Sequence, residues 1–202
     1  MRVLVACEYS GRVRQAFRDL GIDARSCDLL PAEDESIFHT RDSLQNVLAK
    51  SWAMPDMLIA HPPCTYLCNS GVRWLHSDKE RWVMMEEAAE FFRWILDLPI
   101  PYIAVENPVM HKYAREAIRG ERPSFTVQPW QFGDPAKKRT CFWTRNLPPL
   151  VPTSDMTAAD AKPDCHRASP GPDRWKERSR TYQGIANAIA SQWSAILTEH
   201  PR

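Results

Sequence analysis

The residue with the clearest chemical potential is Cys64, which closes the stretch His61-Pro62-Pro63-Cys64. An apolar run over residues 56–60 precedes it and is typical of a buried strand. The two prolines end that strand, because a proline has a fixed φ and no N–H to donate to a sheet. We therefore expect a thiol at the carboxyl end of a strand, which is the edge where open α/β sheets bind ligands.

A cysteine nucleophile needs thiolate character and a nearby acid or base. The best candidate partner is Glu106, which follows a second apolar run over residues 103–105 and precedes Asn107 and Pro108. One strand end would thus carry Cys64 and another would carry Glu106. This arrangement predicts a single active site that is built from both.

Size and charge narrow the class of protein. The chain has 202 residues, which is enough for a single domain, 1–202, with a real core. Its net charge of +1 gives no overall basic signal, so any contact with DNA must come from local patches. We expect neither a signal peptide nor a transmembrane helix, because no stretch approaches roughly 18 apolar residues. Six cysteines without a secretory signal predict free thiols and a cytoplasmic location, in a bacterium or a phage-infected cell.

The N-terminal residues predict a βαβ unit. An apolar strand over 3–7 leads into a turn at residues 8–11, a helix that ends at Gly21, and a second strand that ends at Asp28. An acid at that strand end is where a nucleoside-binding fold places the acceptor for a ribose hydroxyl. The alternative is an ordinary strand–helix turn, because the full glycine-rich phosphate motif is absent.

Further helices and strands are predicted from shorter sequence patterns. Asp42 precedes a helical stretch over 43–50, so it either caps that helix or approaches a cofactor base from the end of a third strand. Ser77 and Glu80 have the spacing of a capping box. The helix that begins there should run to residue 97, with Met84, Ala88, Phe91 or Phe92, and Ile95 on its apolar face. A last helix should carry Ile185, Ile189, Trp193 and Ile196 on one face. Between these two helices we expect a strand over 102–105, a turn at 107–108, a helix over 110–118, strands over 125–130 and 140–144, and an irregular segment over 146–177.

Two clusters allow more than one interpretation. Lys137, Lys138 and Arg139 form a compact basic patch, which is either a solvated tip or a contact for a phosphate or a base. Cys64 and Cys68 lie near His61, but their spacing differs from that of a structural zinc site, so we expect no metal.

The order of these motifs resembles the DNA cytosine-C5 methyltransferases, which use S-adenosylmethionine. The likeness rests on a glycine-bearing turn, a Pro-Cys loop, a Glu-Asn strand end, a basic motif and a closing Gly-x-x-Asn, in that order across nearly the whole chain. It implies a Rossmann-like S-adenosylmethionine-dependent methyltransferase fold, with a central, mostly parallel seven-stranded sheet flanked by helices.

The resemblance also assigns roles to residues. It implies that Cys64 adds to cytosine C6 while protonated Glu106 donates to N3, which requires a raised pKa at Glu106 from a desolvated pocket. Asn107 would hold the loop or the exocyclic amine, and Arg139 or Lys138 would contact O2 or a phosphate. The implied sets are catalytic Cys64, Glu106, Asn107 and Arg139; cofactor-binding Glu8, Tyr9, Ser10, Gly11, Asp28, Asp42, Pro62 and Asn187; and substrate-binding Lys137, Lys138 and Arg139.

The chain departs from the family in three places. The cofactor turn has only Gly11, the basic motif has Lys137 and Lys138 before Arg139, and residues stand between Gly and Asn in the closing motif. Only residues 146–177 fill the place of the usual large target-recognition domain. The resemblance therefore implies one of three arrangements: an enzyme that acts with little sequence context, an enzyme that uses single-stranded DNA, or an enzyme that borrows a partner subunit for recognition. If that segment wraps DNA, its candidate phosphate contacts are Arg167, Arg174, Lys176, Arg178 and Arg180.

Three other functions stay open on the sequence. The chain could methylate C5 of a free pyrimidine deoxynucleotide, with the basic patch gripping one phosphate. It could be a catalytically silent module that regulates a partner. It could also transfer a group other than methyl.

Overall fold

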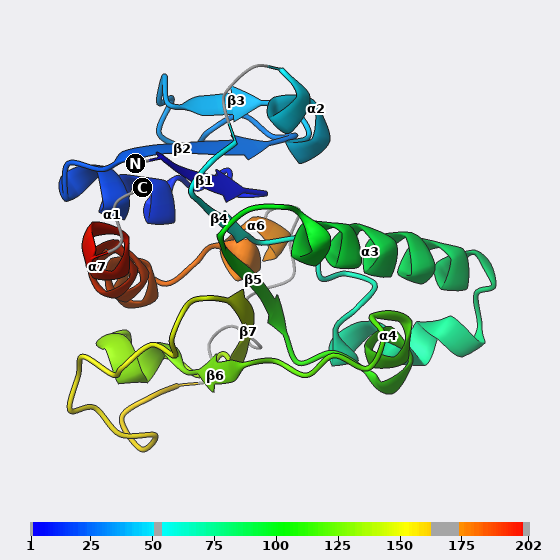
Figure 1. Ribbon diagram of the computed structural model, residues 1–202. Coiled ribbons are helices and arrows are strands. Elements are labelled where there is room, and N and C mark those ends of the chain that lie inside the picture. The colour runs from blue at the N-terminus through cyan, green and yellow to red at the C-terminus, as the bar shows by residue number, and fades with distance from the viewer. Residues whose placement is uncertain (1, 51–53, 163–173, 200–202) are drawn as a thin grey trace.

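The computed structural model describes residues 2–50, 54–162 and 174–199. Its centre is a seven-stranded sheet with the strand order β3-β2-β1-β4-β5-β7-β6 (Figure 1). The strands are β1 (Arg2–Ala6), β2 (Asp23–Asp28), β3 (His39–Arg41), β4 (Met57–Ala60), β5 (Tyr102–Pro108), β6 (Phe125–Val127) and β7 (Thr140–Arg145). The pairs among β3, β2, β1, β4 and β5 are parallel, and β7 is antiparallel to both of its neighbours. The expected mostly parallel α/β sheet is confirmed.

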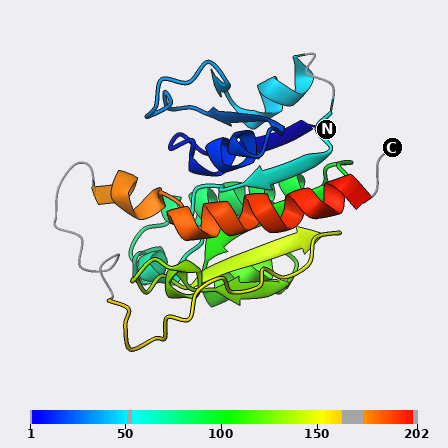
Figure 2. The ribbon, with the colours of Figure 1, turned by 90° about the vertical axis from the view of Figure 1, so that its left-hand side faces the viewer.

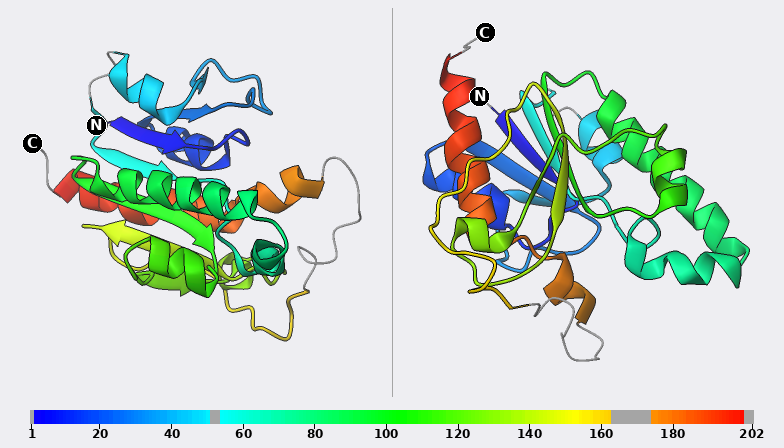
Figure 3. Two further views of the ribbon diagram at one scale, coloured as in Figure 1. Left: turned by 90° about the vertical axis from the view of Figure 1, so that its right-hand side faces the viewer. Right: turned by 90° about the horizontal axis from the view of Figure 1, so that it is seen from below.

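Helices cover both faces of this sheet. They are α1 (Arg12–Asp19), α2 (Leu44–Ala49), α3 (Glu80–Asp97), α4 (Lys112–Ala117), α6 (Arg174–Ser179) and α7 (Gln183–Glu199), together with the 3-10 helices η1 (Asn69–His76) and η2 (Pro129–Phe132). Helices α1 and α7 lie on one face (Figure 2), and α3 and α4 lie on the other (Figure 3).

Alternation along the strands produces two cores. Val3 and Val5 of β1 pack with α1 and α7, whereas Leu4 and Ala6 of the same strand pack toward α3 and α4. All four side chains are at most 1 % exposed. Strands that are buried on both faces read as continuous apolar runs, which explains why β1 and β4 were visible in the sequence.

The sheet has a topological switch at β1. The chain proceeds from β1 to β2 and β3 on one side, and then returns to place β4 and β5 on the other. Connections on opposite sides leave a crevice beyond the carboxyl ends of the two central strands. The residues that follow β1, β2, β3, β4 and β5 therefore converge at one edge.

The long helix α3 is rotated relative to the expectation. Its buried residues are Met85, Ala89, Phe92 and Ile95, whereas Met84 is 40 % exposed. The apolar face was therefore assigned one residue too early at its N-terminal half. Many large residues in this helix are apolar, so the pattern alone did not fix the register.

The start of α3 also differs. The Asp78 carboxylate accepts hydrogen bonds from the backbone N–H groups of Glu80 and Arg81, at 3.0 and 3.4 Å. The Ser77 hydroxyl instead donates to the carbonyl of Trp74. The expected capping box at Ser77 is wrong, and the neighbouring carboxylate performs the equivalent task.

Three other element boundaries differ from those expected from the sequence. Strand β5 continues through Asn107 to Pro108, which the sequence placed in a turn, because these residues pair with Cys141 and Thr140 of β7. Strand β6 ends at Val127, since Pro129 begins η2. Of the expected irregular segment, residues 146–162 contain no helix or strand, residues 163–173 lie outside the described part, and the last four residues belong to α6.

The last helix follows the expectation. Ile185, Ile189 and Trp193 of α7 are at most 2 % exposed, and Ile196 packs partly buried against the same core. The Trp193 indole also donates to the carbonyl of Pro148 at 3.1 Å.

Candidate functional site

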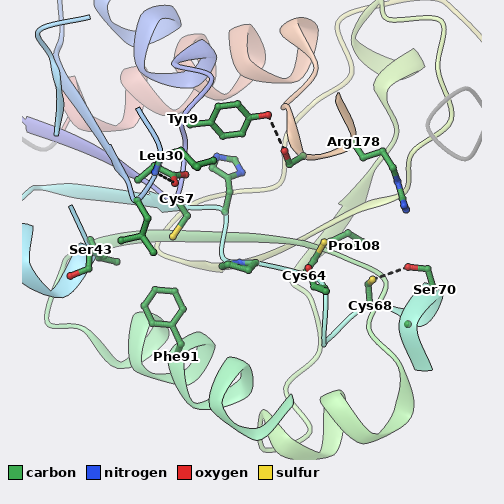
Figure 4. A pocket seen from close by; sticks show the side chains of 18 of the residues that line it. Cys7, Tyr9, Leu30, Ser43, Cys64, Cys68, Ser70, Phe91, Pro108 and Arg178 are labelled. Atoms are coloured by element: carbon green, nitrogen blue, oxygen red, sulfur yellow. Dashed lines mark hydrogen bonds between the residues drawn. The ribbon is translucent and has the colours of Figure 1, made fainter. Parts of the chain in front are cut away.

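A cavity of about 1060 Å³ opens at the carboxyl edge of the sheet. Residues from five strand ends contribute to its wall, and η1, α3 and α6 close its sides (Figure 4). Polar or reactive lining residues include Cys7, Asp28, Asp42, His61, Cys64, Cys68, Lys138, Arg139 and Arg178. A smaller adjoining cavity is lined by Glu106 and Asn107 and shares His61, Cys64, Lys138 and Arg178 with the larger one.

The loop that carries Cys64 is held from two sides. The backbone N–H of His61 donates to the carbonyl of Ala6 at 3.0 Å, which extends the contact between β4 and β1. The Asn107 side-chain Nδ2 donates to the carbonyl of Pro62, also at 3.0 Å, and Asn107 is only 1 % exposed. Of the two expected roles of Asn107, holding the loop is the one with a geometric basis.

Glu106 contacts a residue that the sequence did not assign to catalysis. His61 Nδ1 donates to Glu106 Oε2 at 3.1 Å, and the two side chains are 7 % and 13 % exposed. Burial raises the pKa of Glu106, but the hydrogen bond from His61 and the positive charge of Lys138 outweigh burial and leave the pKa below its ordinary value. The expected raised pKa is therefore wrong for the chain alone.

Cys64 and Cys68 form a coupled pair of thiols. The backbone N–H of Cys68 donates to the carbonyl of Cys64 at 2.9 Å, and a side-chain hydrogen bond joins the two sulfur atoms. That bond, followed by burial, raises the pKa of Cys64. The same bond, together with the hydroxyl of Ser70 at 3.0 Å, lowers the pKa of Cys68 to about 5. In the chain alone, the pair thus holds its negative charge on Cys68.

The ends of β2 and β3 form the other half of the large cavity. Asp28 Oδ1 accepts from the backbone N–H of Leu30 at 2.9 Å, and burial raises the pKa of this carboxyl group. Leu30, Leu44 and Phe91 add apolar surface beside it. A carboxylate next to an apolar wall is the chemistry that a nucleoside requires, with the acid for ribose hydroxyls and the wall for the base.

Asp42 lines the same cavity and also braces α2. Its carboxylate accepts from the Ser43 backbone, from the Asn46 amide and from the Lys50 ammonium, at 2.7 to 2.8 Å. The Lys50 hydrogen bond and the other two lower its pKa to about 2. The N-cap of α2 is Ser43, whose hydroxyl accepts from the backbone of Asn46 at 3.2 Å. The expectation that Asp42 itself caps this helix is wrong by one residue.

The turn after β1 is built around Glu8. Its carboxylate accepts from the backbone N–H groups of Val13 and Arg14, at 2.6 and 3.3 Å, so it satisfies two donors at the start of α1. Glu8 is 3 % exposed, and burial raises its pKa. Gly11 has a φ of 69°, and a side chain there would collide with Arg14. Glu8 and Gly11 therefore shape the turn, while Ser10 lines the smaller cavity.

Helix α6 closes the cavities from the C-terminal side. The Tyr9 hydroxyl donates to the carbonyl of Lys176 at 2.7 Å and lies 3.1 Å from the Ser179 hydroxyl. Lys138 Nζ donates to the carbonyl of Arg178 at 2.7 Å. These contacts place Lys138 and Arg178 beside Cys64, and Arg139 is exposed on the rim of the larger cavity.

Two expected site residues lie elsewhere. Lys137 lines neither cavity, and its backbone N–H donates to the carbonyl of Lys162 at 2.8 Å. Asn187 is exposed on α7, where its side chain accepts from Gln183 at 2.9 Å. Neither contributes to the site in this structure.

The sequence assigned no catalytic or cofactor-binding role to His61, Cys68 or Arg178, although the first two were considered as metal ligands and the third as a phosphate contact. His61 and Cys68 stand three and four residues from Cys64, and a short strand end brings both into the same wall. Polar residues that flank a nucleophile at a strand end were the available signal. Arg178 was expected only as a phosphate contact of a segment that wraps DNA, and the fold of α6 instead brings it to the wall of both cavities.

No protein-family model and no curated protein matches this chain. Among solved structures, the chain is similar to a crystal structure of a triple mutant of DNMT2 from Spodoptera frugiperda, with 16 % sequence identity and a TM-score of 0.41. That match covers 76 % of this chain and 53 % of the other, so the chain spans about half the length of that protein.

Two structural features are absent from the described residues. No helix within residues 2–50, 54–162 and 174–199 is long and apolar enough to cross a membrane. In the same residues, no group of three or more His, Cys, Asp or Glu side chains could hold a metal ion.

Proposed function

We propose that this chain is an S-adenosylmethionine-dependent methyltransferase that methylates C5 of cytosine in DNA through a covalent bond between Cys64 and C6. The observation that carries the proposal is the meeting of Cys64 and the His61–Glu106 pair in adjoining cavities at the switch point of the sheet. Cytosine C5 is a weak nucleophile, and a thiol adding at C6 with an acid at N3 overcomes this.

The cofactor half of the cavity fits a nucleoside. Asp28 would accept hydrogen bonds from ribose hydroxyls, and Leu30, Leu44 and Phe91 would enclose the adenine. Asp42 stands at the same wall. The volume of about 1060 Å³ is large enough for a nucleoside cofactor and a flipped base together. When bound, S-adenosylmethionine supplies an electrophilic methyl group to cytosine C5.

The residues of the chain carry out the remaining steps. Cys64 passes its proton to Cys68 and its sulfur forms a bond with C6. Glu106 donates a proton to N3, which neutralises the charge that this addition places on the ring. After methylation, the C5 proton leaves to solvent, and the electron pair of its bond restores the C5–C6 double bond and expels the Cys64 sulfur as a thiolate. Cys64 then takes its proton back from Cys68, and the N3 proton returns to Glu106, so the reaction releases one proton in all. Asn107 keeps the Cys64 loop in register through Pro62.

The cationic rim supports a phosphate-bearing substrate. Lys138, Arg139 and Arg178 line the cavity near Cys64, where they would contact the phosphates that flank a target base. In duplex DNA that base has to leave the stack before Cys64 can reach it. The short segment 146–177 leaves few residues to read the DNA sequence. The proposal therefore allows three arrangements: the enzyme acts with little sequence context, it acts on single-stranded DNA, or a partner subunit supplies recognition.

Product analysis tests this proposal. The protein is incubated with S-adenosylmethionine carrying a labelled methyl group and with single-stranded DNA, duplex DNA, RNA or deoxycytidine monophosphate, followed by hydrolysis and mass spectrometry. We expect labelled 5-methylcytosine from DNA, and none with Cys64→Ser. A Cys141→Ser protein serves as the matched control, since Cys141 is also a free cysteine and lines neither cavity. Label in deoxycytidine monophosphate alone would show that the substrate is a free nucleotide and not DNA. Label in none of the four substrates would reject the proposal.

A further inference from the structure

The tryptophan of η1 lines the large cavity and is exposed. Trp74 is 50 % exposed, whereas Trp143 and Trp193 are 4 % and 0 % exposed and each donates an indole hydrogen bond to a backbone carbonyl. The next residue, Leu75, is 2 % exposed and anchors η1 in the core. The packing of η1 therefore does not depend on the Trp74 ring, and the ring is available to a ligand in the cavity.

Trp74 belongs to the Cys64 side of this cavity. Figure 4 shows Phe91 on one side of the cavity and Cys64 and Ser70 on the other. Ser70 lies in η1, and Trp74 continues the same wall four residues later. At the rise of a 3-10 helix, about 2 Å per residue, these two residues are about 8 Å apart along η1. A cytosine that reaches Cys64 therefore leaves the Trp74 ring for a neighbouring group.

Guanidinium groups lie over two aromatic rings of this wall. The Arg73 guanidinium is 4.6 Å from the centre of the Trp74 ring. The Arg81 guanidinium is 4.9 Å from the centre of the Tyr66 ring and donates to the carbonyl of Thr65 at 3.1 Å. Aromatic rings interleaved with cations are typical of surfaces that bind single-stranded nucleic acid, where the rings stack on bases and the cations follow the phosphates.

The charge of this side of the cavity is complementary to phosphate. The basic residues that line the cavity are Arg81, Lys138, Arg139 and Arg178. The acidic residues of the same lining, Asp28 and Asp42, stand at the ends of β2 and β3, in the half that fits the cofactor. A nucleic-acid backbone thus meets only positive charges among the charged residues on the Trp74 side of this lining.

We infer that Trp74 stacks on a base next to the target cytosine, and that the substrate is DNA whose strand is unpaired at this point. This inference rests on the proposed function and selects single-stranded DNA among its three arrangements. A duplex keeps the neighbours of a flipped base inside the helix, where a ring on the cavity wall does not reach their faces. An unpaired strand offers the face of every base, and an indole accepts any of them.

DNA binding tests this without methyl transfer. Fluorescence anisotropy measures the affinity for a labelled single strand of about 12 nucleotides with one central cytosine, and for its duplex, at one salt concentration. We expect the single strand to bind at least about tenfold more tightly than the duplex. Trp74→Ala should weaken binding of the single strand about 5- to 50-fold, the loss of one stacked base, and Trp74→Phe should retain most of the affinity. Met84→Ala is the matched control, because Met84 is 40 % exposed and lines neither cavity.

Strands with an abasic site on either side of the cytosine identify the contact. One of these strands should bind the wild-type protein about as weakly as the intact strand binds Trp74→Ala, and Trp74→Ala should not distinguish it from the intact strand. An abasic site that weakens binding equally in both proteins would overturn the stacking contact, as would equal affinity of the wild type for strand and duplex. A loss of affinity for S-adenosylmethionine beyond about threefold in Trp74→Ala would place the ring against the cofactor and would also overturn it.

The inference and the proposed function fail separately. Binding of the single strand that depends on Trp74, with no label in any substrate of the product analysis, would reject the methyltransferase and keep the contact. Equal labelling of single-stranded and duplex DNA, with Trp74→Ala as active as the wild type on both, would reject the contact and keep the methyltransferase.

Discussion

The Asn107 side chain donates a 3.0 Å hydrogen bond to the carbonyl oxygen of Pro62, which joins the strand that carries Glu106 to the loop that carries Cys64. The two candidate reactive groups, Cys64 and Glu106, are 42 positions apart in the sequence. Parallel pairing of β4 and β5 brings their strand ends together, and this bond fixes the loop that extends beyond them.

Asn107→Asp should uncouple the loop from the strand. The aspartate has the same size but cannot donate to Pro62, and it adds a charge beside Glu106. We expect the free energy of unfolding to fall by about 1–3 kcal/mol and methyl transfer to fall about 10²-fold. Urea unfolding and initial rates measure the two effects. Asn187→Asp is the matched control on exposed α7, and equal losses in both variants would contradict the role of Asn107.

The thiol pair should ionise in an unusual order. Cys68 has a pKa of about 5, because Cys64 and Ser70 donate to its sulfur. Alkylation with iodoacetamide at pH values of about 6 to 7, followed by peptide mass spectrometry, should modify Cys68 well below the ordinary thiol range near 8.5. Cys68→Ala removes the partner of Cys64 and should leave Cys64 slow to react below about pH 8.5. Equal alkylation profiles for both cysteines, each centred near 8.5, would exclude the coupled pair.

Asp42 should contribute stability that depends on pH. Its folded-state pKa of about 2 lies below the unfolded value near 3.9. The contribution is therefore complete above about pH 4 and is lost as the pH falls toward 2. Lys50→Gln removes the hydrogen bond that lowers the pKa of Asp42 most, so this pKa should rise toward its ordinary value. Carbon NMR of the carboxyl group reports this directly, and an unchanged midpoint would show that Lys50 does not hold Asp42.

Glu8 should matter for folding more than for cofactor binding. Its carboxylate satisfies two backbone donors at the start of α1. Glu8→Ala should lower the free energy of unfolding by about 1–2 kcal/mol, as for the loss of a helix cap. Glu86→Ala, on the exposed face of α3, is the matched control and should have almost no effect. If Glu8→Ala is as stable as wild type but binds S-adenosylmethionine poorly, Glu8 would instead be a cofactor contact.

The parts of the fold that could be predicted were those set by local pattern. Strands buried on both faces gave continuous apolar runs, so β1, β4 and the start of β5 were visible. The end of β5 was not, because its last residues are held by pairing with β7, and a sequence read locally shows only Asn107 and Pro108 as a turn. The register of α3 failed for a similar reason, since its contact face depends on where the sheet lies.

The residues of the site that could be predicted were likewise those that lie near the strand ends visible in the sequence. Asp28 ends β2, Glu106 lies in the last part of β5, and Cys64 follows the end of β4 by four residues, so the topology of the sheet brings all three to one edge. Asn187 and Lys137 were assigned by resemblance, and the fold leaves both away from the cavities. The contact between His61 and Glu106 decides the charge of the acid, and it depends on side-chain packing across two strands that no spacing along the chain reveals.

The most direct test of the account is the trapping of Cys64. DNA containing 5-fluorocytosine is incubated with the protein and S-adenosylmethionine, and the product is examined by intact and peptide mass spectrometry. Fluorine at C5 prevents the loss that releases the enzyme, so the account predicts a stable adduct of methylated DNA on Cys64 and none in Cys64→Ala. Methylation of unmodified DNA without any such adduct, or an adduct on Cys68 instead of Cys64, would contradict it.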